Sequence, residues 1–330
     1  MIAGTGAAEG AGHGARSPWS RLKVIVTGRP FRLLAFAGAV LLGLGLLYRT
    51  LSRYSIAELS SAVSAVSLGS LVMAGLFAAA SYLTLTFFDF FALRAAGKPL
   101  PYRQAALASF SSLSLGHNVG FAGLSSGAIR YRFYARWGLN AGEVAQVVLF
   151  CGVTVAIGLS TLAGIMLLAD PAAAEQLLGF SRGEVVGIAT LVLALPLGYV
   201  LLAALPERLV RREVWRLHRP PVPLALAQVL VGTVNFACVA ACLHQVVRQM
   251  ADIGYPAVAS TYVAANVATL ITHVPGGLGV VETVVQHLLP GADLIGPLLV
   301  FRIVYFLLPL ALGLALLSAT EIRHRAMSQG

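Results

Sequence analysis

Long apolar runs alternate with short polar segments over most of the chain. A helix needs roughly 20 mostly apolar residues to cross the ~30 Å hydrocarbon core of a bilayer, and several of these runs reach that length without an internal charge. The pattern predicts an all-α integral membrane protein with six full spans. The spans are residues 31–48, 68–93, 143–168, 184–205, 223–247 and 295–317.

Two further apolar stretches, residues 104–122 and 256–290, are interrupted by polar and glycine-rich segments, SLGHNVGFAGLSSG and THVPGGLGVVE. Each predicts a re-entrant helical hairpin that enters the membrane and turns back. Irregular backbone at membrane depth has unpaired N–H and C=O groups, which are tolerated only inside protein or beside a wet cavity. The two breaks are therefore the best indicators of a functional site.

The lysines and arginines indicate the orientation, because cytoplasmic loops of membrane proteins collect them. With the N-terminus inside, most of the 23 basic residues fall on the cytoplasmic side. Those that fall outside are Arg49, Arg53, Arg182 and Arg248. We therefore expect both termini in the cytoplasm.

In this orientation the first hairpin opens to the cytoplasm and the second opens to the outside, so the two halves of the protein are inverted. A short sequence echo agrees, because His117 and His273 are each followed by glycines at the same two spacings. These glycines are Gly120 and Gly123 in the first half, and Gly276 and Gly279 in the second. Inverted repeats that meet at broken helices near the midplane are typical of transporters.

The composition fits a membrane protein, since 58% of the residues are apolar and only 11% are charged, against about a quarter charged in soluble domains. The net charge is +10, but the basic residues lie between apolar segments and not on one soluble surface. We therefore expect contacts with anionic lipid headgroups and no nucleic acid partner.

Three regions follow from these patterns. Residues 1–29 are rich in Gly, Ala and Arg and lack the apolar segment of a signal peptide, which predicts a disordered cytoplasmic tail. Residues 30–320 form the polytopic membrane domain, and residues 321–330 form a second cytoplasmic tail. The localisation expected for this domain is a bacterial-type inner membrane.

Two segments carry a family resemblance: GFAGLSSGAIRYRFYARWGL at residues 120–139 and HVPGGLGVVE at residues 273–282. They resemble the transmembrane flippase region of lysylphosphatidylglycerol synthases, the multiple peptide resistance factor family, and its stand-alone YbhN-like relatives. The order of spans is also similar from about residue 30 to 320. The resemblance implies translocation of aminoacylated or other anionic phospholipid between leaflets.

The same resemblance implies functional roles for Asp89, Arg130 and Glu282. Ser126 stands where the family often has glycine, and Arg130 is in place. Bifunctional members of the family carry a soluble synthase domain after the membrane region, and this chain has none after its last span. We therefore expect a transporter and not an enzyme.

Arg302 lies about eight residues into the last predicted span. A charged side chain at this depth costs about 2.5–3.5 kcal/mol on insertion scales, so it requires an anion. Glu282 is the plainest partner, and two interpretations stay open. The pair is either a static buried ion pair, or Arg302 binds a lipid phosphate while Glu282 attracts a cationic headgroup such as a lysyl amine.

Arg130 follows the first break, where it could collect anionic headgroups at a cytoplasmic mouth. Asp89 either balances Arg130 or Arg94, or is a simple interfacial carboxylate. Arg132 and Arg136 are interpreted as ordinary cytoplasmic anchors.

Polar side chains and glycines border both breaks. The polar residues, which can satisfy freed backbone groups or, alternatively, relay protons or bind metal, are His117, Asn118, His273 and Asn266. The glycines that follow Pro275 are Gly276, Gly277 and Gly279. They allow either a tight turn with close ligand approach or close helix packing.

The leading hypothesis is a lipid translocase whose headgroup path lies between the two hairpins and whose partners are the membrane and anionic phospholipid. A homo-oligomer is left open. No P-loop, DxD pair or metal-ligand cluster occurs in the sequence, so no cofactor and no metal are expected. The alternatives are a membrane-embedded transferase acting on lipid-linked substrates and a non-transporting membrane scaffold.

Overall fold

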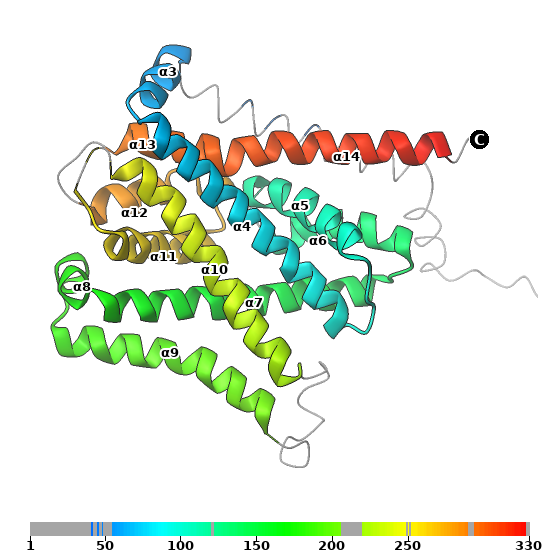
Figure 1. The fold of residues 1–330 in the computed structure, drawn as a ribbon, viewed down its shortest axis with the longest axis horizontal. Coiled ribbons are helices and arrows are strands. Elements are labelled where there is room, and N and C mark those ends of the chain that lie inside the picture. Colours follow the sequence, from blue (N-terminus) through cyan, green and yellow to red (C-terminus); the bar gives the residue numbers. More distant parts are fainter. Residues whose placement is uncertain are drawn as a thin grey trace, which may run out of the picture.

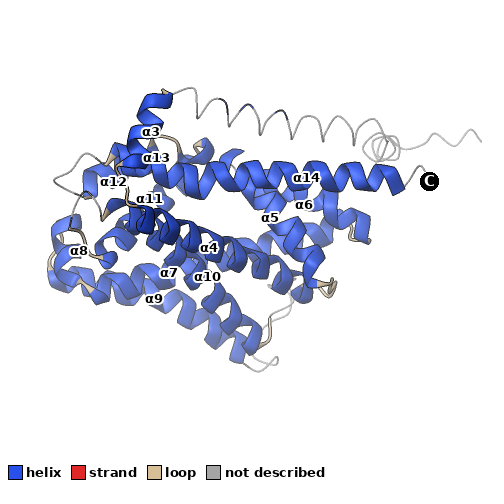
Figure 2. Ribbon diagram, turned by 45° about the horizontal axis from the view of Figure 1, so that its top comes forward, coloured by secondary structure: helices blue, strands red, loops and turns tan. Residues whose placement is uncertain are grey.

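A computed structural model describes residues 55–119, 122–205, 220–248, 252–289 and 294–327, with isolated positions 41, 45, 48 and 250. Figure 2 shows helices throughout these ranges and no strand among them. The helices are α3 Ile56–Ser64, α4 Leu68–Ala95, α5 Tyr102–Val119, α6 Ala122–Tyr134, α7 Ala141–Ala169, α8 Pro171–Leu178, α9 Arg182–Ala204, α10 Val222–Val247, α11 Tyr255–Thr272, α12 Val280–Leu288, α13 Ile295–Arg302 and α14 Leu308–Met327. Short turns are η1 Ala135–Trp137, η3 Pro275–Gly277 and the π-helical η4 Ile303–Leu307.

Five helices in the described ranges are long and apolar enough to cross a membrane. They are α4, α7, α9, α10 and the continuous helix formed by α13, η4 and α14. The five later predicted spans are thereby confirmed, although α14 continues to Met327, ten residues beyond the predicted end. The first predicted span, the tail 1–29 and the loop 206–219 lie outside the described ranges.

Side-chain caps fix where several spans begin. Asn140 at α7 and Ser181 at α9 accept from the backbone N–H three residues on, and Glu143 and Glu184 bond back to each cap residue. Such capping boxes satisfy helix N–H groups that have no partner within the helix. The polar residues between the apolar runs therefore set the helix ends.

The two central helices, α4 and α10, pack against each other and cross the molecule obliquely, and both contact α7 (Figure 1). Helices α7 and α10 approach closely where Gly158 meets Gly232. A Cβ atom on Gly158 would lie 2.3 Å from the Gly232 carbonyl carbon. Small residues thus permit backbone contact at this crossing, as is common in membrane helix pairs.

The two interrupted stretches form helical hairpins at opposite ends of the bundle. Helices α5 and α6 pack together in the half that contains the C-terminal end of α14, and α11 and α12 pack together in the other half (Figure 1). The break η3 contacts α5, so the hairpin tips face each other inside the protein. The prediction of two hairpins entering from opposite ends is confirmed.

The predicted extent of the first hairpin, 104–122, was wrong. Its second arm is α6, which runs to Tyr134 through the segment that contains Arg130. The charges of this segment suggested that the chain had already left the membrane. Arg130 instead lies inside the protein because Asp89 of α4 neutralises it.

Candidate functional site

The break in the second hairpin is built on left-handed backbone. Helix α11 ends at Thr272, and His273, Gly276, Gly277 and Gly279 all have φ between 53° and 86°. Glycine adopts this region without steric cost. A Cβ on Gly277 would also lie 2.9 Å from Thr269 Oγ1, so tight turning and close packing both apply at this position.

Arg302 of α13 joins the last span to this break. Its side chain is 4% exposed, and its guanidinium donates to Glu282 through Nε and Nη2, the latter at 2.7 Å. Nη1 donates to the Gly276 carbonyl at 2.9 Å, and Nη2 donates to the Gly277 carbonyl at 3.0 Å. The structure therefore pairs Arg302 with Glu282 and adds two backbone acceptors that the sequence did not indicate.

Glu282 lies in the first turn of α12 and has a second role there. Its Oε2 accepts a hydrogen bond from the Gly279 N–H at 2.9 Å, the backbone half of a capping box. The side chain is 22% exposed, against 4% for Arg302. One carboxylate thus stabilises the start of α12 and neutralises a buried cation.

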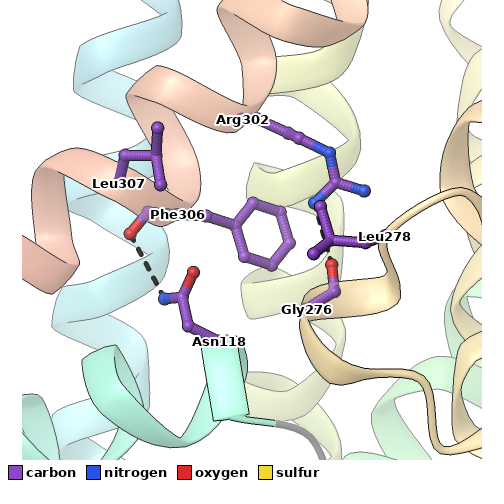
Figure 3. Close-up of a pocket in the computed structure, with 6 residues that line it drawn as sticks. All are labelled: Asn118, Gly276, Leu278, Arg302, Phe306 and Leu307. Carbon is purple, nitrogen blue, oxygen red and sulfur yellow. Dashed lines mark hydrogen bonds between the residues drawn. The ribbon is translucent and has the colours of Figure 1, made fainter. Parts of the chain in front are cut away.

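A small pocket lies between the two hairpin tips. Its lining residues are Asn118, Gly276, Leu278, Arg302, Phe306 and Leu307 (Figure 3). Asn118 Nδ2 donates to Ser114 O at 2.9 Å and to the Phe306 carbonyl at 3.4 Å, which ties the first hairpin tip to the last span. The free space is on the order of one water molecule, so this conformation is closed to a headgroup.

The turn after Arg302 is π-helical, with the Leu308 N–H bonded to the Ile303 carbonyl. The Tyr305 carbonyl in this turn accepts from the Tyr82 hydroxyl at 3.3 Å. Single π-turns inside α-helices occur frequently at functional sites. Nothing in the apolar sequence IVYFL predicts this turn.

A second ion pair, between Arg130 and Asp89, links the second arm of the first hairpin to α4. Arg130 of α6 donates from Nη2 to Asp89 Oδ1 at 2.7 Å and from Nε to Oδ2 at 2.9 Å. Nη1 donates to Ser126 Oγ at 2.8 Å, and the Tyr134 hydroxyl also donates to Asp89. Both charged side chains are at most 2% exposed. Arg130 therefore does not lie at an open mouth, because it is buried with Asp89 among α4, α6 and α7.

This geometry also decides between the interpretations of Asp89. It balances Arg130 and is fully buried, so it is not an interfacial carboxylate. Arg94 instead lies over the Phe90 ring at 3.4 Å and donates to the Phe90 carbonyl.

The other polar residues at the breaks differ in their hydrogen-bond partners. Asn118 caps backbone groups as predicted, and a His273 ring nitrogen lies 2.9 Å from the Ile271 carbonyl. Asn266 bonds the Tyr262 hydroxyl at 3.1 Å, so the predicted backbone role was wrong. His117 stacks on Tyr305, and its buried Nδ1 has no hydrogen-bond partner among the described residues.

Two interactions escaped the sequence analysis. A buried chain of polar groups runs from the Tyr305 hydroxyl through Ser81 to Asn235, with oxygen separations of 3.0 and 2.7 Å. Glu321 of α14 pairs with Arg132 and Arg136, so these arginines have a structural partner as well as an anchoring position. Within the described ranges, no three His, Cys, Asp or Glu side chains are grouped as a metal site.

Two relatives match most of the chain. It is 32% identical over 250 residues to the uncharacterised protein slr0712 of Synechocystis, covering 74% of this chain and 78% of that protein. It is 29% identical over 246 residues to the inner membrane protein YbhN of Escherichia coli, covering 71% and 74%. No family model matches the chain. These relatives and the five apolar helices indicate a multi-pass protein of the inner membrane.

Proposed function

Because this chain belongs to the family of YbhN-like inner membrane proteins, we propose that it is a lipid translocase that moves anionic phospholipid between the leaflets. The headgroup passes between the two hairpin tips, and the acyl chains stay in the bilayer. The observation that carries the proposal is the buried Arg302 guanidinium, held by a broken helix where the two hairpins meet.

Three features support this function. Non-helical backbone inside a membrane protein is typical of transport sites, because it brings carbonyls and helix ends to the ligand. The planar guanidinium fork of arginine matches the oxygen atoms of a phosphate. The hairpins enter from opposite ends, which suits a site that opens alternately to each side.

The proposed orientation places both termini in the cytoplasm, as the distribution of basic residues indicates. The α5–α6 hairpin then opens to the cytoplasm and the α11–α12 hairpin opens to the outside. Aminoacylated lipids are the substrates that the resemblance to lysylphosphatidylglycerol flippases favours, and Glu282 would attract their cationic amine.

The test is headgroup movement in vesicles that contain the purified protein and a fluorescent phosphatidylglycerol, with dithionite quenching of the outer leaflet. Arg302→Ala removes the fork, so we expect loss of protein-dependent movement. Arg182→Ala is the matched control, because Arg182 is exposed at the start of α9 and contacts neither break. Movement by Arg302→Ala at the wild-type rate contradicts the proposed site.

One observation favours a second candidate, a non-transporting membrane scaffold. The Arg302 fork is already occupied by Glu282, and the adjacent pocket has room for about one water molecule. A scaffold predicts no lipid movement by the wild-type protein in the same vesicles.

A further inference from the structure

The guanidinium of Arg302 uses its two edges for different partners. The edge formed by Nε and Nη2 faces the two oxygens of Glu282, the bidentate arrangement that arginine also makes with phosphate. The remaining contacts go to the Gly276 and Gly277 carbonyls. Those carbonyls belong to the backbone and hold the guanidinium in place whatever occupies the first edge.

The two buried ion pairs differ in accessibility. Asp89 and Arg130 are 0% and 2% exposed, so neither partner can be reached in this conformation. In the other pair Arg302 is 4% exposed and Glu282 is 22% exposed. A ligand that approaches this second pair therefore meets the carboxylate first, with the arginine fork behind it.

The Glu282 carboxylate also lies against the N-terminus of α12, where it accepts from the Gly279 N–H. An anion at this point gains both the helix N-terminal dipole and the arginine fork. Both sets of donors suit a phosphate as well as they suit a carboxylate. In this structure the Glu282 carboxylate accepts hydrogen bonds from both sets of donors.

We propose that Glu282 is a resident substitute for the phosphate of the substrate, and that a phosphate monoester or diester displaces it from Arg302. The proposal rests on the translocase function for its biological setting, while the anion site itself rests on the geometry of Arg302. Displacement breaks the side-chain link between α12 and α13, while the Gly276 and Gly277 carbonyls still hold Arg302 to the break.

There is a physical reason for the protein to keep the Glu282 carboxylate at this site when no ligand is bound. An empty fork would leave a buried cation without a counter-charge, which is energetically costly. Glu282 avoids this cost when no ligand is bound. It also competes with the ligand, which keeps binding weak enough for release on the other side.

The test is ligand affinity of the purified full-length protein in detergent, measured by isothermal titration. One arm uses dihexanoyl-phosphatidylglycerol, a second uses inorganic phosphate, and dihexanoylglycerol is the phosphate-free reference. Glu282→Gln keeps the size of the side chain but removes the competing charge. We expect its affinity for a phosphate-bearing ligand to rise about tenfold or more, or about 1.4 kcal/mol.

Glu184→Gln is the matched control, because Glu184 closes the same kind of capping box at α9 and is exposed. We expect no gain in affinity from it. Glu282→Asp, which keeps the charge on a shorter side chain, gives a second measurement if Glu282→Gln does not yield folded protein. Its weaker hold on Arg302 predicts a smaller gain of the same sign.

The two arms separate the sources of phosphate. A gain for phosphatidylglycerol alone assigns the site to a lipid headgroup, and a gain in both arms assigns it to the phosphate group itself. No gain in either arm for a folded Glu282 variant overturns the proposal.

The vesicle assay keeps this result apart from the translocase function. Arg302-dependent lipid movement without any affinity gain refutes the substitute role and leaves the function standing. An affinity gain in a protein that moves no lipid supports the anion site and refutes the translocase.

Discussion

Removing Asp89 tests how much the first hairpin depends on its buried ion pair. In Asp89→Ala, Arg130 keeps the Ser126 hydroxyl and the weak Cys151 contact as acceptors but loses its counter-charge. Breaking a buried pair on one side costs about 3–5 kcal/mol, because a charge is left uncompensated in a low-dielectric interior. We therefore expect the thermal midpoint to fall by of order 10 °C.

The assay is thermal unfolding in detergent, followed by intrinsic fluorescence. Asp252→Ala is the control, because it removes an exposed carboxylate before α11 and should leave the midpoint unchanged. The double variant Asp89→Leu with Arg130→Met replaces the pair by apolar groups and should recover most of the loss. An unchanged midpoint in Asp89→Ala, or a double variant no better than the single one, refutes the reasoning.

Two further predictions concern glycines, again read from thermal midpoints in detergent. Gly158→Ala places a methyl group against the Gly232 backbone and should destabilise the protein by about 1–3 kcal/mol. The control is Gly152→Ala, which lies in the same helix with open space around it and should leave the midpoint unchanged. Equal midpoints for the two variants would show that α7 and α10 separate freely. Gly277→Ala adds left-handed strain of roughly 1–2 kcal/mol and a contact with Thr269, so it should destabilise more than Gly97→Ala, which adds strain alone. Equal losses would mean that the packing around Gly277 gives way.

The two ion pairs differ in burial and in the elements they join. The Asp89–Arg130 pair is buried among α4, α6 and α7 and fixes one arm of the first hairpin. The Arg302–Glu282 pair is partly open and fixes the second hairpin to the last span. In the proposed function, the second pair exchanges partners with the substrate while the first holds α6 to α4.

The sequence by itself determined the membrane class, the five confirmed spans and the positions of both breaks. These features depend on local properties, namely the length of apolar runs and the backbone freedom of glycine. The pairing of Arg302 with Glu282 also followed, because a charge at that depth needs an anion and few are available. The length of the first hairpin did not follow, since the charges of its second arm suggested an aqueous segment.

Only the tertiary structure decided the other side-chain contacts between helices. Asp89 and Arg130 are 41 residues apart, and they are buried because α4 and α6 both pack against α5 and α7. The carbonyl contacts of Arg302 and the π-helical turn beyond it depend on how the last span meets η3 and α4. Such contacts are set by long-range packing, whereas hydropathy and glycine patterns report only on the local chain.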